Sequence, residues 1–542
     1  YVFDGSSGSG RNALFTGQAA DPARWHLYSG SSPVTVGPPV GTGVVQVHTV
    51  TFDDGFNEHR INGEIASGGG APLQALRGLI LGARYTTDFH LDGAISEVLI
   101  YEGVLGEDDR SAIESYLLDK HPITDPDEPP VVVDVFAGGD GLYDTYRIPS
   151  ILTTEAGTIL AFAEGRANAS DHARNDIVMR RSTDGGDTWS PVTVLHDAGG
   201  DSLNDPLVLQ VRDGVHAGRV YLCYMSFPEG CHTNCVPLGY GAGTSRNWLM
   251  WSDDDGVTWT APFDVTESFR RETTNFAGTP GVGFQKRHEP FQGRLVFPLR
   301  QGPAGSVKMY ALFSDDGGDT WTRGDLVDDS QTVGGGDEVQ MVELPDGSLL
   351  LNARSYAATN HRKMARSLDG GATWTPLTDT SLIEPQVMGS LVSLTEAGDG
   401  FDASRLLYAG PNSSSSRVDG SIWVSEDGGA SWAFARSIFP GSYAYSVLTV
   451  IDPCEEIGCL FERDGYRFIS LARIHPTWLL GERDGGCPCV ADVNGDGALD
   501  IFDILAFLAL LDGGDVGADW NGDTVLDIFD VLGFLEAFDA GC

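Results

Sequence analysis

The stretch YDTYRIPSILTTEAGTILAFAEGRANASDHARNDIVMRRSTDGGDTW, residues 143–189, decides the fold of this chain. Arg147 stands before Ile-Pro at the end of a short aromatic-rich run, where the proline prevents a regular strand from continuing. Asp171 lies in a polar loop, residues 167–175, between two strand-like runs. The last eight residues, 182–189, combine two glycines with an aspartate that can bond backbone amides, a pattern that predicts a hairpin turn.

The same turn pattern recurs four more times with the same spacing from serine to tryptophan. The copies are 252–259, 314–321, 367–374 and 425–432. Successive tryptophans are 70, 62, 53 and 58 residues apart, about one four-stranded sheet each. Repeats of this length predict a β-propeller built by radial repetition.

Size and composition indicate a mainly β protein of several domains. The chain has 542 residues, of which 41% are hydrophobic, with 70 glycines and 11 tryptophans. This length exceeds one ordinary domain. Tight turns joining short strands are typical of such a composition, and we expect helices mainly near the two ends.

The net charge of −43 restricts the partners of the chain. It argues against nucleic acid and anionic membranes as general partners. An anionic sugar would be repelled at long range, so any anion site must rest on a local cluster of arginines. No stretch is long enough and apolar enough to span a bilayer, which predicts no membrane span.

The eight cysteines include three close pairs, at 231/235, 454/459 and 487/489, with Cys223 and Cys542 left over. None shows the spacing of a zinc ribbon. Short-loop disulfides in an exported protein are the favoured interpretation, although the spacing leaves the connectivity open. The sequence begins at Tyr1 without Met or a signal peptide, so we expect a fragment or processed form that is secreted, extracellular or cell-surface associated.

The Arg-Ile-Pro motif and the repeated turns, known as Asp boxes, resemble the sialidase (neuraminidase) family. The resemblance covers about residues 133–475. It implies a six-bladed β-propeller over 131–478 and a sialylated glycan as substrate. The boxes support the fold and not activity, because they occur at turns away from catalysis and in non-enzymatic propellers. An insert rich in Cys and Gly, residues 223–244, departs from the family pattern and is a candidate rim loop.

Three arginines match the family positions that hold the substrate carboxylate. They are Arg147, Arg354 and Arg417, each in a different repeat. A guanidinium offers paired N–H donors to one anion, so three that converge would bind a carboxylate well. The alternative for any single arginine is a surface salt bridge.

The resemblance also assigns catalytic residues. Tyr445 matches the nucleophile and Glu338 the glutamate that takes its proton, whereas Tyr443 should face the other side of the strand. A neutral phenol can approach a substrate carboxylate that would repel a carboxylate nucleophile. Asp171 matches the general acid/base, with Asp176 as its competitor and the better candidate for a structural role.

Four further residues have supporting roles by resemblance. Asp205 matches an aspartate that bonds a sugar hydroxyl, and Arg166 is assigned to the same end of the sugar. Glu462 matches the glutamate that orients the first arginine, and Glu164 is a second candidate for that role. Glu343 is expected to be a surface residue at a strand end.

Residues 1–122 resemble a laminin-G or concanavalin-like jelly roll that is incomplete at its N-terminus. We expect strands at 44–51, 79–82 and 93–101, followed by a helix that starts at the acidic segment 106–109. Both sugar binding and a spacer role remain open for this domain. The polar, proline-rich segment 123–130 is a stiff linker.

After a linker at 479–488, residues 489–542 form a small α-helical domain that resembles a dockerin, a module that binds a cohesin-type protein partner. Two loops place oxygen ligands at the spacing of a calcium-binding EF-hand loop, and an apolar, helix-like run follows each. The predicted Ca²⁺ ligands are Asp492, Asn494, Asp496, Asp500, Asp503, Asp519, Asn521, Asp523, Asp527 and Asp530. A calcium-stabilised terminal cap without a partner is the alternative.

The leading hypothesis is therefore an exo-α-sialidase, a glycoside hydrolase that releases terminal sialic acid with retention through a tyrosyl intermediate and needs no cofactor for catalysis. One alternative is a non-catalytic propeller, a lectin or adhesin that binds sialoglycans with the same arginines. Another is a glycosidase that acts on a related nonulosonic acid. Retention of Asp171, Glu338 and Tyr445 favours an enzyme over a lectin, because binding a carboxylate needs no nucleophile.

Overall fold

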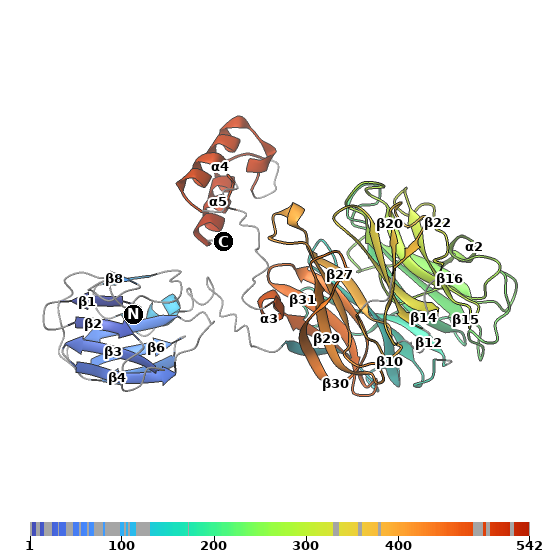
Figure 1. Ribbon diagram of the computed structural model, residues 1–542, viewed down its shortest axis with the longest axis horizontal. Coiled ribbons are helices and arrows are strands. Elements are labelled where there is room, and N and C mark those ends of the chain that lie inside the picture. Colours follow the sequence, from blue (N-terminus) through green and yellow to red (C-terminus); the bar gives the residue numbers. More distant parts are fainter. Residues whose placement is uncertain are drawn as a thin grey trace. The chain divides into compact units, whose positions relative to one another are not determined.

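A computed structural model of the chain divides it into two compact units, Tyr1–Glu128 and Pro129–Cys542 (Figure 1). The described residues are 3–6, 11–15, 24–30, 32–39, 47–53, 56–61, 64–69, 80–81, 98–101, 105–106, 109–114, 130–171, 173–328, 335–355, 360–377, 381–480, 491–494, 499–520 and 525–540. The fold is mainly β, as the composition predicts, and the helices are short.

The described residues of the first unit form two antiparallel sheets. The larger has the order β4-β3-β2-β1-β8 and consists of β1 (Phe3–Ser6), β2 (Arg11–Phe15), β3 (Arg24–Gly30), β4 (Ser32–Pro39) and β8 (Ile80–Leu81). The smaller consists of β5 (His48–Asp53), β6 (Phe56–Ile61) and β7 (Glu64–Gly69). The predicted strands at 44–51 and 79–82 coincide in part with β5 and β8.

The third predicted strand of this unit, 93–101, is absent over its described residues. Residues 98–101 are not in a strand, and their four apolar side chains are exposed, so burial does not support their β propensity there. Residues 93–97 lie outside the described ranges. The predicted helix is present over residues 109–114. The jelly-roll assignment stays a prediction.

The strands of the second unit pair with their neighbours in sequence, as hairpins require. One nine-stranded sheet contains β10 (Thr145–Thr153), β11 (Ile159–Arg166), β12 (Asn175–Ser182), β13 (Thr193–His196), β14 (Ser202–Gln210), β15 (Val220–Phe227), β16 (Arg246–Ser252), β17 (Phe263–Asp264) and β18 (Gly281–Val282). Two four-stranded sheets follow: β19 (Phe284–Gln285), β20 (Leu295–Gln301), β21 (Lys308–Ser314) and β22 (Thr322–Arg323), then β23 (Gly336–Glu343), β24 (Leu349–Ser355), β25 (Lys363–Ser367) and β26 (Thr375–Pro376).

The last large sheet joins the end of this β region to its start. It contains β27 (Ser390–Thr395), β28 (Arg405–Pro411), β29 (Val418–Ser425), β30 (Ala433–Asp452), β31 (Glu456–Arg463), β32 (Phe468–Ile474) and β9 (Val131–Ala137). β32 pairs antiparallel with β9, with Phe468 opposite Ala137. Chain segments more than 300 residues apart therefore share one sheet. The count of six blades stays a prediction.

Helices complete the second unit. They are α2 (Thr266–Phe269), α3 (Pro476–Leu480), α4 (Ile501–Gly513), α5 (Ile528–Ala540) and the short 3-10 helices η1 (Ala397–Asp399) and η2 (Val516–Ala518). Across the described ranges, no helix is long and apolar enough to cross a membrane.

Each Asp box is the turn between two antiparallel strands, as the repeats predict. In the first box, Ser182 Oγ donates to Asp184 Oδ1 at 2.7 Å, and the same carboxylate accepts the backbone N–H of Thr188 at 3.0 Å. Gly185 and Gly186 have φ of 68° and 94°, which favour glycine. Equivalent serine and aspartate bonds recur in the other four boxes.

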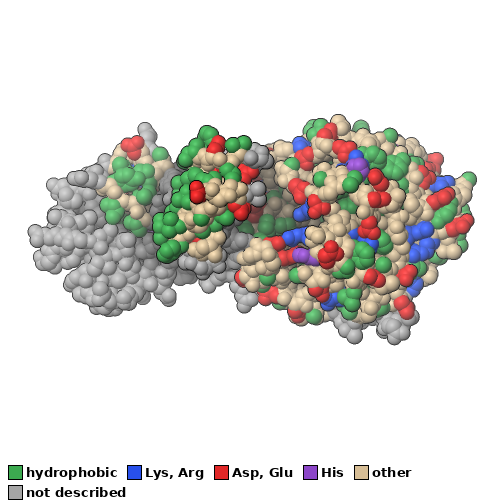
Figure 2. All heavy atoms as spheres, turned by 90° about the horizontal axis from the view of Figure 1, so that it is seen from above, with side chains coloured by type: hydrophobic (Ala, Val, Ile, Leu, Met, Phe, Trp, Pro, Cys, Tyr) green, Lys and Arg blue, Asp and Glu red, His purple; other side chains and the backbone are tan. Residues whose placement is uncertain are grey.

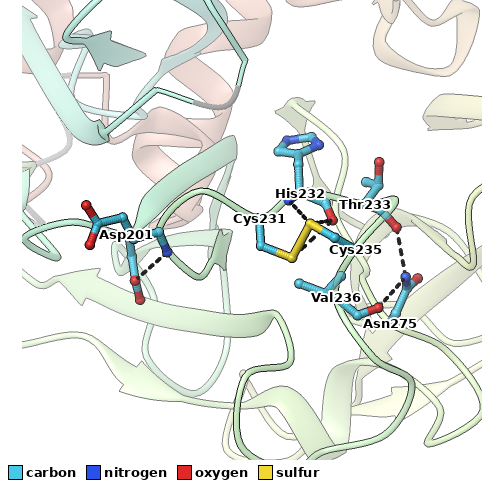
Figure 3. The surroundings of a disulfide bond; sticks show 8 residues. Asp201, Cys231, His232, Thr233, Cys235, Val236 and Asn275 are labelled. Atoms are coloured by element: carbon cyan, nitrogen blue, oxygen red, sulfur yellow. Dashed lines mark hydrogen bonds between the residues drawn. A yellow bond between two sulfur atoms is a disulfide. The ribbon is translucent and has the colours of Figure 1, made fainter.

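The disulfide pattern corrects one expected close pair. Cys231 and Cys235 form a disulfide, and Asn275 Nδ2 binds the carbonyls of Thr233 and Val236 beside it (Figure 3). Cys454 is disulfide-bonded, but Cys459 is a free thiol, so a short-loop bond between these two is wrong. Cys459 is unavailable because it lies fully buried between strands.

Acidic side chains are scattered over the face of the molecule seen in Figure 2, among smaller numbers of basic ones. On this face the described acidic side chains are not gathered in one patch. The buried arginines described next are the exception to the general charge of the protein.

Candidate active site

Breaks in strand pairing position the candidate residues. Strand pairing loses regular register on β10, β14, β23 and β30 between residues 147 and 150, 204 and 207, 336 and 339, and 443 and 446, respectively, and β30 has further register shifts elsewhere. Arg147 borders the first break, and Asp205, Glu338 and Tyr445 lie inside the other three. Such irregularities re-aim side chains next to active sites.

Two of these breaks hold residues in a left-handed backbone conformation. Ile148 has a φ of 58° and Asp205 a φ of 56°, and a proline follows each. Because a β-branched residue such as Ile rarely adopts this conformation, its strain must be offset by surrounding contacts. The amide of Ile148 donates to Glu462 Oε1 at 2.8 Å, which is one such contact.

Glu462 is paired with Arg147, the arginine that the resemblance assigns it to orient. Arg147 Nε donates to Glu462 Oε1 at 2.6 Å, and Nη2 donates to Oε2 at 3.3 Å. The Arg147 guanidinium lies over the Tyr466 ring, 3.8 Å from its centroid. Although burial acts to lower the pKa of Arg147, Glu462 raises it on balance, so this arginine stays charged.

Tyr445, Glu338 and Arg354 form one bonded group. The Tyr445 hydroxyl donates to Glu338 Oε1 at 2.5 Å. Arg354 Nη1 donates to Glu338 Oε2 at 2.9 Å and to the Tyr445 oxygen at 3.2 Å. The phenol is thus held between a carboxylate that can accept its proton and a cation that can stabilise its oxygen.

The third arginine reaches the same tyrosine from another strand. Arg417 Cζ lies 5.5 Å from the centroid of the Tyr445 ring, and Arg147 Cζ lies 5.8 Å from it. Arg417 Nη1 donates to the Tyr466 hydroxyl at 3.0 Å, and Nη2 donates to the Gln386 carbonyl at 3.0 Å. The structure therefore brings all three predicted arginines to one tyrosine, although their positions in the sequence are far apart.

Asp171 lies at the exposed side of the site. Its Oδ1 accepts from Arg166 Nη1 at 2.5 Å and lies 3.9 Å from Arg147 Nη1, and its side chain is 61% exposed. Partial burial acts to raise the pKa of Asp171, but Arg166 lowers it on balance. Asp176, its competitor, instead accepts a bond from the buried Tyr143 hydroxyl at 2.7 Å, which fits the structural role expected for it.

Glu164, the second candidate for orienting Arg147, has other hydrogen-bond partners. Glu164 is fully buried and accepts from Arg166 Nε at 2.8 Å and from the Asp205 amide at 2.9 Å. Its side chain faces Arg166 because β11 carries both residues on one face, two positions apart. Glu164 therefore supports Arg166 and Asp205, and Glu462 alone of the two is bonded to Arg147.

Arg300 was not among the predicted site residues. It lies on β20 and donates to Asp205 Oδ2 at 3.2 Å and to Asp337 Oδ1, and it lies 3.7 Å from Glu338 Oε1. No motif in the sequence distinguishes it from other strand arginines. Tyr466 and Gln386 were missed for the same reason, and both have positive φ, at 72° and 57°.

Burial and charge set opposite protonation states at the centre. Burial raises the pKa of Tyr445 well above its usual range, and Glu338 adds to this effect, so the phenol is neutral. Burial also acts to raise the pKa of Glu338, but Arg354 and Arg300 lower it on balance. An ionised carboxylate therefore faces a neutral phenol, the arrangement that a general base and a nucleophile require.

Tyr443 and Glu343, for which no catalytic role was predicted, are both buried. Tyr443 is buried with its hydroxyl 3.4 Å from Cys459 Sγ, in a core separate from the site. Glu343 is not a surface residue as expected, because its carboxylate is buried and accepts from Lys286 and from the amide of His288 at 3.1 Å. The charge of Lys286 compensates for that burial.

The predicted calcium ligands are only partly described. Asp496, Asn521 and Asp523 lie outside the described ranges, and the described residues contain no group of three or more His, Cys, Asp or Glu placed to hold a metal. The two loops nevertheless end alike. Asp503 accepts the amides of Asn494 at 3.2 Å and Asp500 at 2.8 Å, and Asp530 accepts those of Trp520 and Asp527, both at 2.8 Å. Calcium binding by these loops stays a prediction.

Fold and site together define a class: a mainly β repeat protein in which strands bring three arginines to a tyrosine–glutamate pair. The chain belongs to the BNR repeat-like domain family, whose pattern matches residues 157–453. That match covers more than half of the chain.

Individual relatives agree with this family. A sialidase of Micromonospora viridifaciens is 33% identical over 365 residues, 64% of this chain and 54% of that protein. A sialidase of Bacteroides fragilis (strain YCH46) is 29% identical over 359 residues, 61% of this chain and 62% of that protein. The chain thus spans little more than half the length of these relatives.

A solved structure shares the fold. The Hadza microbial sialidase Hz136 superimposes with a TM-score of 0.57 at 23% sequence identity, over 78% of this chain and 74% of that chain. At this level of identity the likeness concerns the fold alone.

Proposed function

We propose that the protein is an exo-α-sialidase that hydrolyses the glycosidic bond of a terminal sialic acid with net retention. The observation that carries the proposal is the 2.5 Å bond from the Tyr445 hydroxyl to Glu338, facing three arginines. A lectin would need the arginines to bind a carboxylate, but not a nucleophile paired with its base. The sialidases among its relatives support the same function.

The residues divide the work as follows. Arg147, Arg354 and Arg417 bind the sugar carboxylate, which places the anomeric carbon near the Tyr445 oxygen. As that oxygen bonds to the anomeric carbon, its proton passes to Glu338. The bond from the anomeric carbon to the leaving oxygen breaks, and Asp171 protonates that oxygen. Water then attacks the anomeric carbon and gives a proton to Asp171, while the bond to the Tyr445 oxygen breaks and Glu338 returns its proton to that oxygen. This second inversion restores the original configuration.

The acid role of Asp171 requires a change at the site when substrate binds. In the free protein its carboxylate pairs with Arg166, and this pairing lowers its pKa. A proton donor must carry its proton at the working pH. The leaving group must therefore approach the exposed carboxylate of Asp171 and weaken its contact with Arg166.

The architecture that we propose is a six-bladed propeller over residues 131–478. Six consecutive groups of antiparallel strands support it: β10 to β13, β14 to β17, β19 to β22, β23 to β26, β27 to β30, and β30 to β32 with β9. The pairing of β32 with β9 would close the ring, which removes free sheet edges.

We also propose that the C-terminal domain binds Ca²⁺ through the loops 492–503 and 519–530 and docks on a cohesin-type protein. Exposed apolar side chains on α4 and α5 support a docking role. They are Ile501, Phe502, Leu505, Leu508, Ile528, Phe529, Leu532 and Leu535. Secretion is part of the same proposal, because calcium modules and the Cys231–Cys235 disulfide suit an oxidising exterior.

The test is turnover of methylumbelliferyl α-sialoside by the wild type, Tyr445→Phe and Tyr443→Phe. We expect Tyr445→Phe to lose about 10²–10⁴-fold in turnover, the usual scale for removal of a catalytic group, and Tyr443→Phe to remain active. Proton NMR should show the α-anomer as the first product. Binding of sialic acid without turnover by the wild type would instead favour the lectin. Turnover of only a related nonulosonic acid would change the substrate and keep the mechanism.

A further inference from the structure

Arg300 is the point at which three buried carboxylates converge. It donates to Asp205 and Asp337, and its Nη2 lies 3.7 Å from Glu338 Oε1. These carboxylates come from two strands, β14 and β23, whereas Arg300 comes from β20. Asp205, Asp337 and Glu338 are at most 6% exposed, so water does little to screen their mutual repulsion.

The remaining contacts of Arg300 fix the orientation of its guanidinium group. Its Nε donates to the Gly278 carbonyl at 3.0 Å, and its guanidinium lies 5.6 Å from the Phe276 ring centroid. With Nε used by the backbone, both terminal nitrogens face the acidic residues. A rigid fork held in this way can bond two carboxylates at once.

Glu338 and Asp337 are adjacent in the chain, yet they face different partners. Asp337 bonds to Arg300, whereas Glu338 bonds to Tyr445 and Arg354. If Arg300 were absent, two neighbouring buried carboxylates would compete for Arg354. One of them would then take up a proton, as like charges in one site require.

We propose that Arg300 is a positioning residue for the reaction, which keeps Glu338 ionised and directed at the Tyr445 hydroxyl by pairing with the neighbouring carboxylates of Asp337 and Asp205. This proposal rests on the hydrolase function proposed above. It assigns to Arg300 no contact with the sugar. The residue acts through the base, and it should therefore affect the pH at which the base works.

The charges around Glu338 have the required signs. It faces Tyr445 from β30, Arg354 from β24, Arg300 from β20, Asp337 from β23 and Asp205 from β14. Burial raises the pKa of Asp337, with Glu338 adding to the effect and Arg300 opposing it, whereas the pKa of Glu338 is lowered. Arg300 and Arg354 thus favour the charged form of the base.

The experiment measures kcat/KM against pH for the wild type and Arg300→Met. The acid limb of this profile reports the ionisation of the base in the free enzyme. Loss of an opposite charge close to a carboxylate raises its pKa by about 1–3 units. We therefore expect the limb to move to higher pH by at least about one unit, which means about a tenfold loss of kcat/KM below the limb.

Two further variants separate charge from shape. Arg300→Lys keeps the positive charge but loses the planar pair of N–H donors. Compared with Arg300→Met, its acid limb should therefore lie closer to the wild-type pH, while kcat stays reduced. Asp337→Asn removes one competitor for Arg300, so its limb should move to lower pH. If Arg300→Met does not fold, these two variants carry the test. A limb at the wild-type pH in Asp337→Asn, or at the Arg300→Met position in Arg300→Lys, contradicts the proposal.

The control is Arg294→Met, which removes a buried arginine just before the same strand. Arg294 pairs with Asp315 at 2.6 Å and with the Gly370 carbonyl at 3.0 Å. The Arg294→Met variant should lose stability, but the acid limb of its kcat/KM profile should stay at the wild-type pH. The assignment would be overturned if the acid limb of Arg300→Met lay at the same pH as that of Arg294→Met and only the maximal kcat/KM were lower.

Failure of the proposed function can be told apart from failure of this assignment. If the wild type turns over no sialoside, carbon NMR follows the titration of the Glu338 carboxyl in the wild type and in Arg300→Met. The signal is assigned by its absence in Glu338→Gln. A higher titration midpoint in Arg300→Met supports the role of Arg300 without any turnover. An unchanged midpoint refutes it.

Discussion

At the scale of single residues, Tyr445 is defined by its neighbours. A carboxylate accepts its proton at 2.5 Å, a guanidinium donates to its oxygen at 3.2 Å, and two more guanidinium groups lie within 6 Å of its ring. Burial keeps the phenol neutral until the base removes its proton. The surrounding arginines can then stabilise negative charge on the oxygen and on the substrate.

Arg417 allows carboxylate binding to be tested apart from the base. Its hydrogen bonds go to Tyr466 and Gln386, whereas those of Arg354 go to Glu338 and Tyr445. We expect Arg417→Ala to weaken sialic-acid binding, measured by calorimetry, by about 1.5–3 kcal/mol, since one charge-assisted bond pair is lost. Its acid limb of kcat/KM should stay in place. Arg354→Ala should weaken binding and also move that limb to higher pH; unchanged affinity in both variants would contradict the arginine cluster.

Asp205 should make stability depend on pH. Burial raises its pKa from 3.8 to about 7, with Glu164 and Glu338 adding to the effect and Arg300 opposing it. A raised pKa in the folded state means that this contribution to stability is complete below about pH 4 and is lost as the pH rises to about 7. Replacement by Asn removes the titration. Relative to wild type, Asp205→Asn should gain stability across this interval by up to about 1.4 kcal/mol per pH unit, and remain level above it.

Thermal unfolding of both proteins between pH 4 and pH 8 measures this difference. Tm values that differ by the same amount at every pH would show that Asp205 does not titrate in this interval. The turnover of Asp205→Asn is a separate question, because Asp205 is also assigned to a sugar hydroxyl.

At the scale of elements, the Asp boxes and the register breaks have separate tasks. The boxes close hairpins, and the Ser and Asp side chains of each box bond within their own turn, although other box atoms such as the Gly370 carbonyl also bond to residues outside it. The breaks lie on β10, β14, β23 and β30, where they re-aim the residues of the site. Damage to a box should therefore reduce stability before it affects chemistry.

Asp369→Ala tests the structural role of a box. Asp369 accepts from Ser367 Oγ at 2.8 Å, from the Thr373 amide at 2.8 Å and from Thr373 Oγ1 at 2.6 Å. Loss of these bonds should lower the free energy of unfolding by about 1–3 kcal/mol, measured by denaturant titration, with kcat unchanged. The adjacent Leu368 is 72% exposed, so Leu368→Ala is a matched control in the same turn. Equal stability of the two variants would show that the box bonds do not matter.

At the scale of the whole molecule, calcium should matter only to the C-terminal domain. α4 and α5 follow two acidic loops, and the small core between them contains Phe507, Trp520 and Phe534. Without a cation the loop carboxylates would repel one another, so chelation should unfold this domain. Hydrolysis should continue, since the described site of the β region rests on arginines and carboxylates with no group placed to hold a metal.

Hydrogen exchange with and without a chelator measures this prediction. Peptides of α4 and α5 should lose protection, while those of β20 and β21 serve as the internal reference. Loss of activity in the chelator with β20 and β21 still protected would point to a metal near the active site. Unchanged protection of α4 and α5 would remove calcium from the C-terminal proposal.

Much of the fold was predictable from local patterns along the chain. The five boxes predicted their own hairpins, because serine, aspartate and glycine act on a turn within a few residues. The Arg-Ile-Pro motif, together with family resemblance, was enough to select the residues that meet at Tyr445. The strand expected at 93–101 is absent over residues 98–101, because the apolar side chains there are exposed and neighbours in sequence cannot report burial.

What local chemistry could not predict is which distant groups share a bond. Arg147 and Glu462 are 315 positions apart, β9 pairs with β32, and Arg300 joins Asp205 to Asp337. Cys459 was assigned to a close pair, but packing buries it away from Cys454. Residue types and turns follow from interactions across a few positions. Protonation states and partners follow from the packing of distant strands, because that packing decides how much water and which charges each group meets.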